Sequence, residues 1–199
     1  MARPRTYNEG EIITKAMHAF WNKGFAATSI SDLEDATGLK RTSLYAAFGD
    51  KQGLYIKCLE TYKEMGQEQA DLLLQPSEDP VQEIYNWFIK NINQGLGDPE
   101  RKGCFFNNAC SERGSTCTET KSLLSENRKA VLERFALKLE EAKSLGQIKQ
   151  ESDVASLANF LFSLQSGLMI NLKNGASKEE LFAALDTGMQ CFPTLTIGR

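Results

Sequence analysis

The sequence contains little of what a catalytic centre needs. It has a single histidine, His18, and no Walker loop, nucleophile elbow or dinucleotide-binding fingerprint. We therefore expect neither an enzyme nor a cofactor, and we interpret His18 as a surface or helix-packing residue. The cysteines number five, and an odd number argues against a disulfide framework and for a reducing compartment. The predicted location is the cytoplasm.

Long hydrophobic runs are scarce as well. The N-terminus lacks the apolar core of a signal peptide. The most membrane-like stretch, Val154 to Leu172, is interrupted by polar residues, which are Ser156, Asn159, Ser163, Gln165, Ser166 and Asn171. Such frequent polar side chains argue against a membrane-spanning helix and favour a helix that is buried in protein. We expect no membrane partner.

Positive charge is not in excess, so any nucleic-acid surface must come from local placement. The chain of 199 residues has a formal net charge of −3 and 41% hydrophobic residues, enough to bury a sizeable core. Residues 1–60 hold eight basic and seven acidic side chains. Strand-like alternation is missing, whereas apolar residues recur at three- and four-residue spacing through most of the chain. We therefore predict an all-α protein.

Residues Thr28 to Lys51, TSISDLEDATGLKRTSLYAAFGDK, contain two short helical patterns that pivot on Gly38. We expect Thr28 to cap the first helix, with Ser29 as the alternative, because a hydroxyl accepts hydrogen bonds from first-turn amides. Gly38 supplies the left-handed backbone that ends this helix. The second pattern turns Leu44 inward and polar side chains outward. This spacing is typical of a helix-turn-helix, but it also fits the solvated polar face of a short helix.

The outward face of the second helix matches the chemistry of a DNA major groove. Arg41 has the fork that binds guanine N7 and O6, Thr42 can bond base edges or phosphates, and Ala46 can touch a thymine methyl group. Ser43 is a further candidate for base contacts. Lys51 lies near the predicted start of the next helix, where amides and the helix dipole favour a phosphate. The residues expected to hold phosphates are Thr28, Lys40, Tyr45 and Lys51.

The first five residues place two arginines around a proline. Proline restricts the residue before it, so this run does not readily begin a helix. Arg3 and Arg5 can form an arm that reaches the minor groove or the phosphates, as N-terminal arms of other proteins do. The alternative is a disordered basic tail.

The residues around this motif resemble the N-terminal signature of the TetR/AcrR family of bacterial transcriptional regulators, over roughly residues 8–56. The matching positions are Gly24, Phe25, Thr28, Gly38, Leu39, Leu44, Tyr45, Phe48, Lys51 and Leu54. The resemblance implies a three-helix DNA-binding domain at residues 1–52 and a larger helical regulatory and dimerisation domain at 53–199. It also implies a homodimer that binds double-stranded DNA and usually represses transcription until a small molecule binds. A two-fold dimer would meet a palindromic operator.

One residue departs from the usual helix-turn-helix pattern. Glu34 lies four residues before Gly38, where a small residue is usual. Its long acidic side chain must point outward or find a partner. Ser31 and Glu34 also have the spacing of a capping box, so the first motif helix can alternatively begin later than Thr28 implies.

Helical patterns continue beyond the motif, at about 50–74, 81–96, 123–145, 154–172 and 177–192. Apolar residues cover several sides of the pattern at 154–172, which therefore needs partners on more than one face. In the family that the chain resembles, the last two helices pair with those of a second copy in a four-helix interface. The alternative is one larger monomeric core.

Lys102 to Cys117 holds three of the five cysteines, namely Cys104, Cys110 and Cys117. Three interpretations compete for them. They can pack in a core or pocket, because reduced cysteine behaves as a small hydrophobe. They can sense oxidants or electrophiles, if Lys102, Arg113 or a helix N-terminus lowers the pKa of a thiol. They can bind a soft metal such as Cu(I), but the metal-ligand spacing is missing, so we predict no metal site.

A small-molecule pocket is expected among aromatic and thiol side chains of the regulatory part. The candidates are Tyr85, Phe88, Cys104, Phe105, Phe106, Cys110, Phe135 and Phe162. The sequence does not separate residues that face a pocket from residues that face the core. A helical interaction module that does not bind DNA remains the contrasting interpretation.

Overall fold

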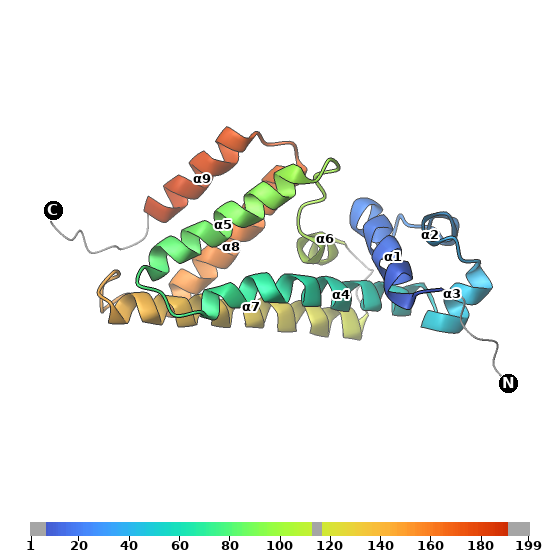
Figure 1. Cartoon of the computed structure of the whole chain (residues 1–199), viewed down its shortest axis with the longest axis horizontal. Helices are drawn as coiled ribbons and strands as arrows, with labels where there is room; N and C mark the ends of the chain where they lie inside the picture. Colours follow the sequence, from blue (N-terminus) through green and yellow to red (C-terminus); the bar gives the residue numbers. More distant parts are fainter. Residues whose placement is uncertain (1–6, 113–116, 191–199) are drawn as a thin grey trace. The chain divides into compact units, whose positions relative to one another are not determined.

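The computed structural model describes residues 7–112 and 117–190, and all regular secondary structure in these ranges is helical (Figure 1). The helices are α1 (Glu9–Lys23), α2 (Ile30–Thr37), α3 (Arg41–Phe48), α4 (Lys51–Asp71), the 3-10 helix η1 (Leu72–Leu74), α5 (Pro80–Gly97), α6 (Phe105–Ser111), α7 (Thr118–Ser144), α8 (Val154–Lys173) and α9 (Lys178–Gln190). The all-α prediction is confirmed.

The chain packs as two compact units. The first unit consists of Met1–Met65 and Asn108–Ser125, and the second consists of Gly66–Asn107 and Glu126–Arg199. Helices α4, α6 and α7 therefore contribute residues to both units. The boundary expected at residues 52 and 53 differs from this division, because the first half of α4 packs against α1 rather than with the regulatory helices.

Aromatic rings form the centre of the first unit. Phe20 of α1 meets Tyr55 of α4 edge to face, with ring centroids 5.0 Å apart, and Phe25 lies 4.8 Å from the same tyrosine ring. Cys58 donates a hydrogen bond from Sγ to the carbonyl oxygen of Ile13, at 3.5 Å. Phe20, Tyr55 and Cys58 are almost completely buried. Their burial stabilises the packing of α4 against α1 in the unit that also contains the motif helices α2 and α3.

Helix α2 begins with a capping box. Ser29 is the N-cap; its side chain accepts from the amide of Asp32, and the Asp32 carboxylate accepts from the Ser29 amide at 2.7 Å. Lys23 Nζ lies 2.5 Å from Asp32 Oδ1. The hydrogen bond from Lys23, with those from Ser29, holds the pKa of Asp32 well below its usual range.

Two predictions about the start of α2 are wrong. Thr28 is not the cap, because its side chain is fully buried and its hydroxyl donates to the carbonyl oxygen of Gly24 at 2.6 Å. The alternative start at a Ser31–Glu34 capping box is also incorrect, because α2 already begins at Ile30. Asp32 takes the place in the box that the sequence analysis assigned to Glu34. Gly38 adopts φ 74° and ends the helix as predicted.

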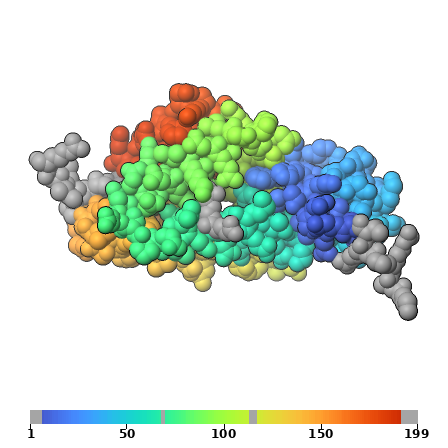
Figure 2. Space-filling view, in the orientation of Figure 1, coloured from blue at the N-terminus to red at the C-terminus, as the bar shows by residue number. Residues whose placement is uncertain are grey.

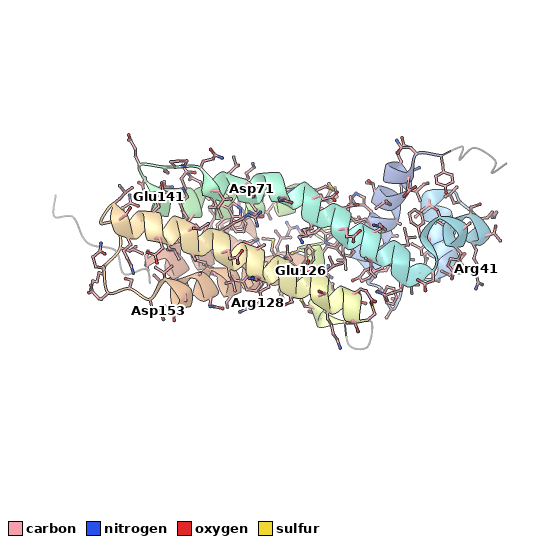
Figure 3. All side chains as sticks on the ribbon, turned by 90° about the horizontal axis from the view of Figure 1, so that it is seen from below. Arg41, Asp71, Glu126, Arg128, Glu141 and Asp153 are labelled. Carbon is pink, nitrogen blue, oxygen red and sulfur yellow. The ribbon has the colours of Figure 1, made fainter. Side chains whose placement is uncertain are left out.

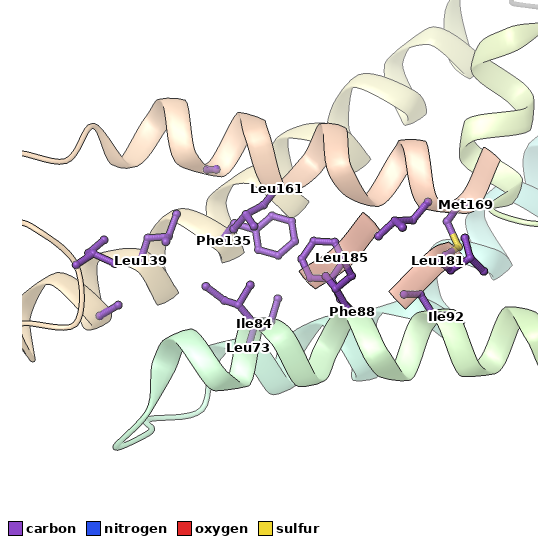
Figure 4. Packing of buried hydrophobic residues seen from close by; sticks show 14 of the residues in the cluster. Leu73, Ile84, Phe88, Ile92, Phe135, Leu139, Leu161, Met169, Leu181 and Leu185 are labelled. Atoms are coloured by element: carbon purple, nitrogen blue, oxygen red, sulfur yellow. The ribbon is translucent and has the colours of Figure 1, made fainter. Parts of the chain in front are cut away.

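The second unit has an apolar core between α5, α7, α8 and α9 (Figure 4). The rings of Phe88 and Phe135 stack with centroids 6.1 Å apart. Leu161 of α8 and Leu185 of α9 belong to the same core and are fully buried. Figure 2 shows α9 (red) beside α5 (green) at the surface of this unit. Interlocking apolar faces of four helices thus hold the unit together.

A buried lysine joins α7 to the segment after η1. Lys138 Nζ donates to the carbonyl oxygen of Gln75 at 2.5 Å and to Glu141 Oε2 at 2.7 Å. Glu141 Oε1 accepts from the amide of Ser77, and these hydrogen bonds, that from Lys138 above all, lower the pKa of Glu141. Arg134 binds Asp71 Oδ1 through Nε and Nη2, at 2.9 and 2.6 Å. The two cations of α7 therefore bind groups at the end of α4 and after η1.

The loop between α5 and α6 is also fixed by ion pairs and close packing. Lys102 is 6% exposed and pairs with Asp98 and Glu100, each at 2.8 Å. Gly103 has φ 69°, and a Cβ atom there would lie 2.8 Å from the carbonyl oxygen of Met169. Only glycine allows this backbone to approach α8 so closely. The start of α6, with Cys104, is thereby anchored.

Candidate nucleic-acid interface

Helix α3 presents a polar face to solvent. Arg41, Thr42 and Ala46 are exposed, whereas Leu44 is 2% exposed and holds α3 on the unit core. Ser43 and Tyr45 are partly exposed. The Arg41 guanidinium lies over the Tyr45 ring, 5.1 Å from its centroid, and Arg41 projects from α3 in Figure 3. The structure thus brings the predicted base-contacting side chains together on one helix.

The residues expected to hold phosphates differ in their exposure to solvent. Lys40 is exposed at the start of α3. Lys51 is partly buried, with Nζ 4.4 Å from the centroid of the Phe25 ring, and desolvation lowers its pKa. Thr28 is fully buried with its hydroxyl bonded to Gly24, which corrects its predicted role as an exposed phosphate ligand. Arg3 and Arg5 lie outside the described residues.

The start of α4 differs from the phosphate site that the sequence suggested. Asp50 Oδ1 accepts from the amide of Gly53 at 2.7 Å, so a carboxylate already serves one of the first amides of the helix. The Lys51 side chain extends over Phe25 instead. A phosphate at this point would therefore be bound by the lysine cation rather than by all the amides of the helix end.

Glu34 has a partner that the sequence analysis did not identify. Its Oε1 accepts from the amide of Arg41 at 2.9 Å, seven residues along the chain. The N-cap residue of α3, Lys40, makes no capping hydrogen bond with its side chain. Glu34 thus supplies from α2 the acceptor that α3 lacks locally. A lysine at the N-cap position, which has no acceptor in its side chain, and an acid in the preceding helix were the only signals available in the sequence.

Glu112 is the second functional candidate that the sequence analysis missed. Its two carboxylate oxygens accept from the amides of Phe25 and Ala26, at 2.9 and 3.1 Å. Gly24 leaves room for this carboxylate, because a Cβ atom at Gly24 would lie 2.6 Å from Glu112 Oε1. The contact holds the connection between α1 and α2 from a residue that directly follows α6. No local sequence pattern joins positions so far apart in the chain.

A further hydrogen bond joins the start of α7 to α4 within the first unit. Gln52 Nε2 donates to Thr120 Oγ1 at 2.9 Å, and Thr120 is buried. The amide of Thr120 in turn donates to Cys117 Sγ at 3.4 Å. The residues on either side of 113–116 therefore bond within the first unit: Glu112 to the α1–α2 connection, and Cys117 to Thr120, which in turn bonds to α4.

The predicted pocket residues are dispersed, and several of them belong to the packed core. Phe88 and Phe135 stack on each other, and Phe105 and Phe106 are buried. Tyr85 donates from its hydroxyl to Asp186 at 2.7 Å, and this hydrogen bond raises the tyrosine pKa. Phe162 is partly buried, and the Arg128 guanidinium lies 5.5 Å from its ring centroid. Cys104 is partly buried, whereas Cys110 is exposed.

Depressions in the surface lie away from these side chains. One of about 480 Å³ is lined by residues of the α8–α9 junction, including Asn171, Asn174 and Glu180. Another of about 670 Å³ lies along the outer face of α5. Among the described residues, Trp87 Nε1 on α5 and Gln165 Oε1 on α8 are buried polar atoms without a hydrogen-bond partner. These two polar atoms are pocket candidates that the sequence analysis did not name.

The cysteines occupy different environments. Burial raises the pKa of the Cys58 thiol, which lies in the core of the first unit. Cys110 is exposed on α6, two residues before Glu112, and Cys117 is partly buried. In the ranges 7–112 and 117–190, no group of three histidine, cysteine or acidic side chains is placed to hold a metal ion. His18 is exposed and stacks on Trp21, with centroids 6.2 Å apart.

Comparison with known proteins identifies similar chains over nearly the full length. Residues 12–58 match the model of bacterial regulatory proteins of the tetR family, and residues 81–187 match the tetracyclin repressor-like C-terminal domain. The HTH-type transcriptional repressor ComR of Escherichia coli (strain K12) is 31% identical, over 97% of this chain and 92% of its own length. The uncharacterized HTH-type transcriptional regulator YezE of Bacillus subtilis (strain 168) is 27% identical, over 95% and 98%.

Solved structures share the fold. A cysteine mutant of the TetR family transcriptional regulator CifR, complexed with 26-bp double-strand operator DNA, superposes with a TM-score of 0.83 at 25% identity. The match covers 96% of this chain and 100% of that one. The reduced form of Escherichia coli NemR gives a TM-score of 0.82 at 18% identity, over 94% and 98%, which reflects the fold alone.

Replacing Glu112 by alanine should loosen the connection between α1 and α2. The variant loses two charge-assisted hydrogen bonds, so we expect about 1–2 kcal/mol lower stability of the first unit and faster hydrogen exchange at the amides of Phe25 and Ala26. Glu64→Ala, which removes an exposed carboxylate from α4, is the matched control. Unchanged exchange at both amides in Glu112→Ala would contradict the role of this carboxylate.

Alkylation should distinguish the cysteines of the first unit. At pH 8, iodoacetamide should label Cys110 rapidly and Cys58 slowly, because burial both shields Cys58 and raises its pKa, which keeps the thiol protonated. Mass spectrometry of peptides after timed quenching gives the two rates. In urea, Cys58 should react as fast as Cys110, and equal rates in the native protein would refute the assignment.

Proposed function

The chain belongs to the TetR family of bacterial regulatory proteins, and from that premise we propose that it is a homodimeric repressor released from operator DNA by a small molecule. It is a DNA-binding transcriptional regulator, as are its relatives, and we assign it no catalytic role. Its place of action is the cytoplasm. The observation that carries the proposal is the exposed polar face of α3, set opposite the buried Leu44.

Helix α3 is the recognition helix in this proposal. Arg41, Thr42 and Ser43 contact base edges, and Ala46 meets a thymine methyl group. Lys40, Tyr45 and Lys51 hold phosphates, which position the helix without selecting sequence. The placement of Lys40, Arg41 and Lys51 explains how the first unit can bind DNA although acidic and basic residues are nearly equal in number in residues 1–60. An arm of Arg3 and Arg5 can add contacts in the minor groove.

The proposed dimer interface lies on α8 and α9. Helix α8 is long and apolar enough to cross a membrane by length and composition, and only 28% of that stretch is buried within one chain. Phe160 and Ile170 are 37% and 48% exposed. A second copy that covers this apolar surface accounts for its composition without a membrane, and a two-fold axis gives one operator two recognition helices.

The proposed ligand site lies in the core of the second unit. Trp87 Nε1 offers an unbonded donor and Gln165 Oε1 an unbonded acceptor, and both are buried. Phe88 and Phe135 lie beside Trp87, which contacts each ring at about 5 Å. A largely apolar ligand with an acceptor for Trp87 Nε1 would satisfy that buried donor beside the two phenylalanine rings, and a ligand donor could serve Gln165 Oε1 of α8.

Release from DNA requires that the ligand favour a state with a weaker DNA-binding surface. Helix α6 contributes residues to both units, and Glu112, directly after it, holds the α1–α2 connection. A displacement of α6 on ligand binding would withdraw this carboxylate from the two amides. The first unit would then lose the two hydrogen bonds that hold the connection before α2, and with them the orientation of α2 and α3.

A thiol-responsive regulator is the second candidate function. It is favoured by the exposure of Cys110, which lies two residues before Glu112 on the same segment. Modification of this thiol would add bulk next to the carboxylate that holds the head. Retention of the full response to the inducing compound after serine replaces Cys104, Cys110 and Cys117 would exclude this function.

Substitutions on the DNA-binding face should separate base contacts from phosphate contacts. On a duplex selected by the wild-type protein from random double-stranded DNA, Arg41→Ala should cost about 1–3 kcal/mol and relax base choice at one position. Lys51→Ala should weaken binding similarly on all duplexes and reduce the salt slope by about one.

Fluorescence anisotropy at several salt concentrations measures both effects, and Lys57→Ala is the control, since Lys57 pairs with Glu60 on α4. Equal behaviour of the Arg41 and Lys51 variants would contradict the division of roles. A correctly folded wild-type protein that selects no duplex would favour the interaction-module interpretation.

Charge on the outer face of α8 should dissociate the dimer. Sedimentation at micromolar concentration should give a dimer for the wild-type protein and a monomer for Phe160→Glu/Ile170→Glu, because two buried carboxylates would face an apolar partner. Leu137→Glu changes a side chain on α7 that is 61% exposed, and this control should remain dimeric. A wild-type monomer would refute the interface.

A further inference from the structure

Glu34 closes the helix-turn-helix turn at two points. Its carbonyl oxygen accepts from the amide of Gly38 at 2.8 Å, which ends α2. Its side-chain Oε1 accepts from the amide of Arg41 at 2.9 Å, which begins α3. One residue therefore accepts hydrogen bonds from the backbone on both sides of the turn.

The side-chain bond serves the first amide of α3, that of Arg41, whereas the amide of Ser43 donates to the carbonyl oxygen of Lys40 at 2.8 Å. The first amides of a helix have no intrahelical acceptor, and an N-cap side chain usually serves one of them. Lys40 occupies the N-cap position and makes no side-chain capping bond. The Glu34 carboxylate takes over this part, and its negative charge interacts favourably with the positive end of the α3 dipole.

The same carboxylate changes the electrostatics of the DNA-binding face. A helix N-terminus with unbonded amides attracts phosphates irrespective of base sequence. At α3 that position already holds an anion, next to the exposed cations Lys40 and Arg41. The carboxylate repels a phosphate from the amide, whereas Arg41 remains able to reach a base through its long side chain.

We propose that Glu34 is a positioning residue that raises sequence specificity: it fixes the first turn of α3 and excludes a non-specific phosphate contact there. This inference rests on the proposed function of α3 as the recognition helix. Glu34 does not contact the bases itself in this scheme. It reduces the contribution of phosphate contacts at the helix end to the DNA-binding energy, so the base-contacting side chains contribute a larger share.

Asp35 provides a matched control for the effect of charge alone. It is the next residue of α2 and is exposed, whereas Glu34 is partly buried. Asp35→Asn and Glu34→Gln each remove one negative charge from neighbouring positions. Glu34→Gln retains an oxygen that can accept from the Arg41 amide, and Glu34→Ala removes both the charge and the acceptor.

The experiment compares two duplexes, one selected by the wild-type protein and one of equal length and composition with a scrambled sequence. We expect Glu34→Gln to bind the scrambled duplex about two- to fivefold more tightly, the gain that a helix-terminus charge effect allows. The selected duplex should gain less, so the ratio of the two affinities falls. Asp35→Asn should leave that ratio unchanged, because its charge does not lie at the amide.

Glu34→Ala separates the positioning role from the charge effect. We expect faster hydrogen exchange at the Arg41 amide and weaker binding of the selected duplex, with Glu34→Gln restoring slow exchange. An unchanged affinity ratio in Glu34→Gln, in a protein whose wild type selects a duplex, would overturn the inference about Glu34 alone. Failure of the wild-type protein to select any duplex would instead overturn the proposed function and this specificity role with it.

Discussion

Short helices leave a large share of their backbone amides without intrahelical partners, and this constraint shapes the DNA-binding head. Helices α2 and α3 have eight residues each. Side chains supply the missing acceptors: Ser29 and Asp32 form the capping box of α2, and Glu34 serves the first amide of α3. Glu112 serves two amides of the connection before α2. Without them, two helices of only about two turns each would depend on the burial of Leu33 and Leu44 alone for their placement.

The same arrangement explains how an acidic protein can carry a DNA-binding face. Four carboxylates of the first unit accept from backbone amides, namely those of Asp32, Glu34, Asp50 and Glu112, and Asp32 is also paired with Lys23. Lys40 and Arg41 are left on the exposed side of α3. Acidic and basic side chains thus occupy different places in the first unit. The net charge of the chain therefore does not describe the charge of the surface proposed to meet DNA.

Much of the fold follows from local patterns in the sequence. Apolar spacing predicts the helices, and Gly38 marks the end of α2 that the structure has. The cap of α2 was harder to predict, because Thr28 and Ser29 have similar hydroxyls. Burial decides between them: Thr28 turns into the core and bonds to Gly24, so Ser29 is left to cap.

The sequence by itself determined the helical class, the family and the side chains that α3 exposes, because these depend on short spacings along one chain. Tertiary structure alone decided that Glu34 caps α3, that Glu112 holds the α1–α2 connection and that Phe88 and Phe135 pack against each other. Hydrogen bonds and ring contacts between distant segments depend on three-dimensional approach, which no local periodicity encodes. The sequence alone does not show whether a long acidic side chain in a helix faces water or an unbonded amide.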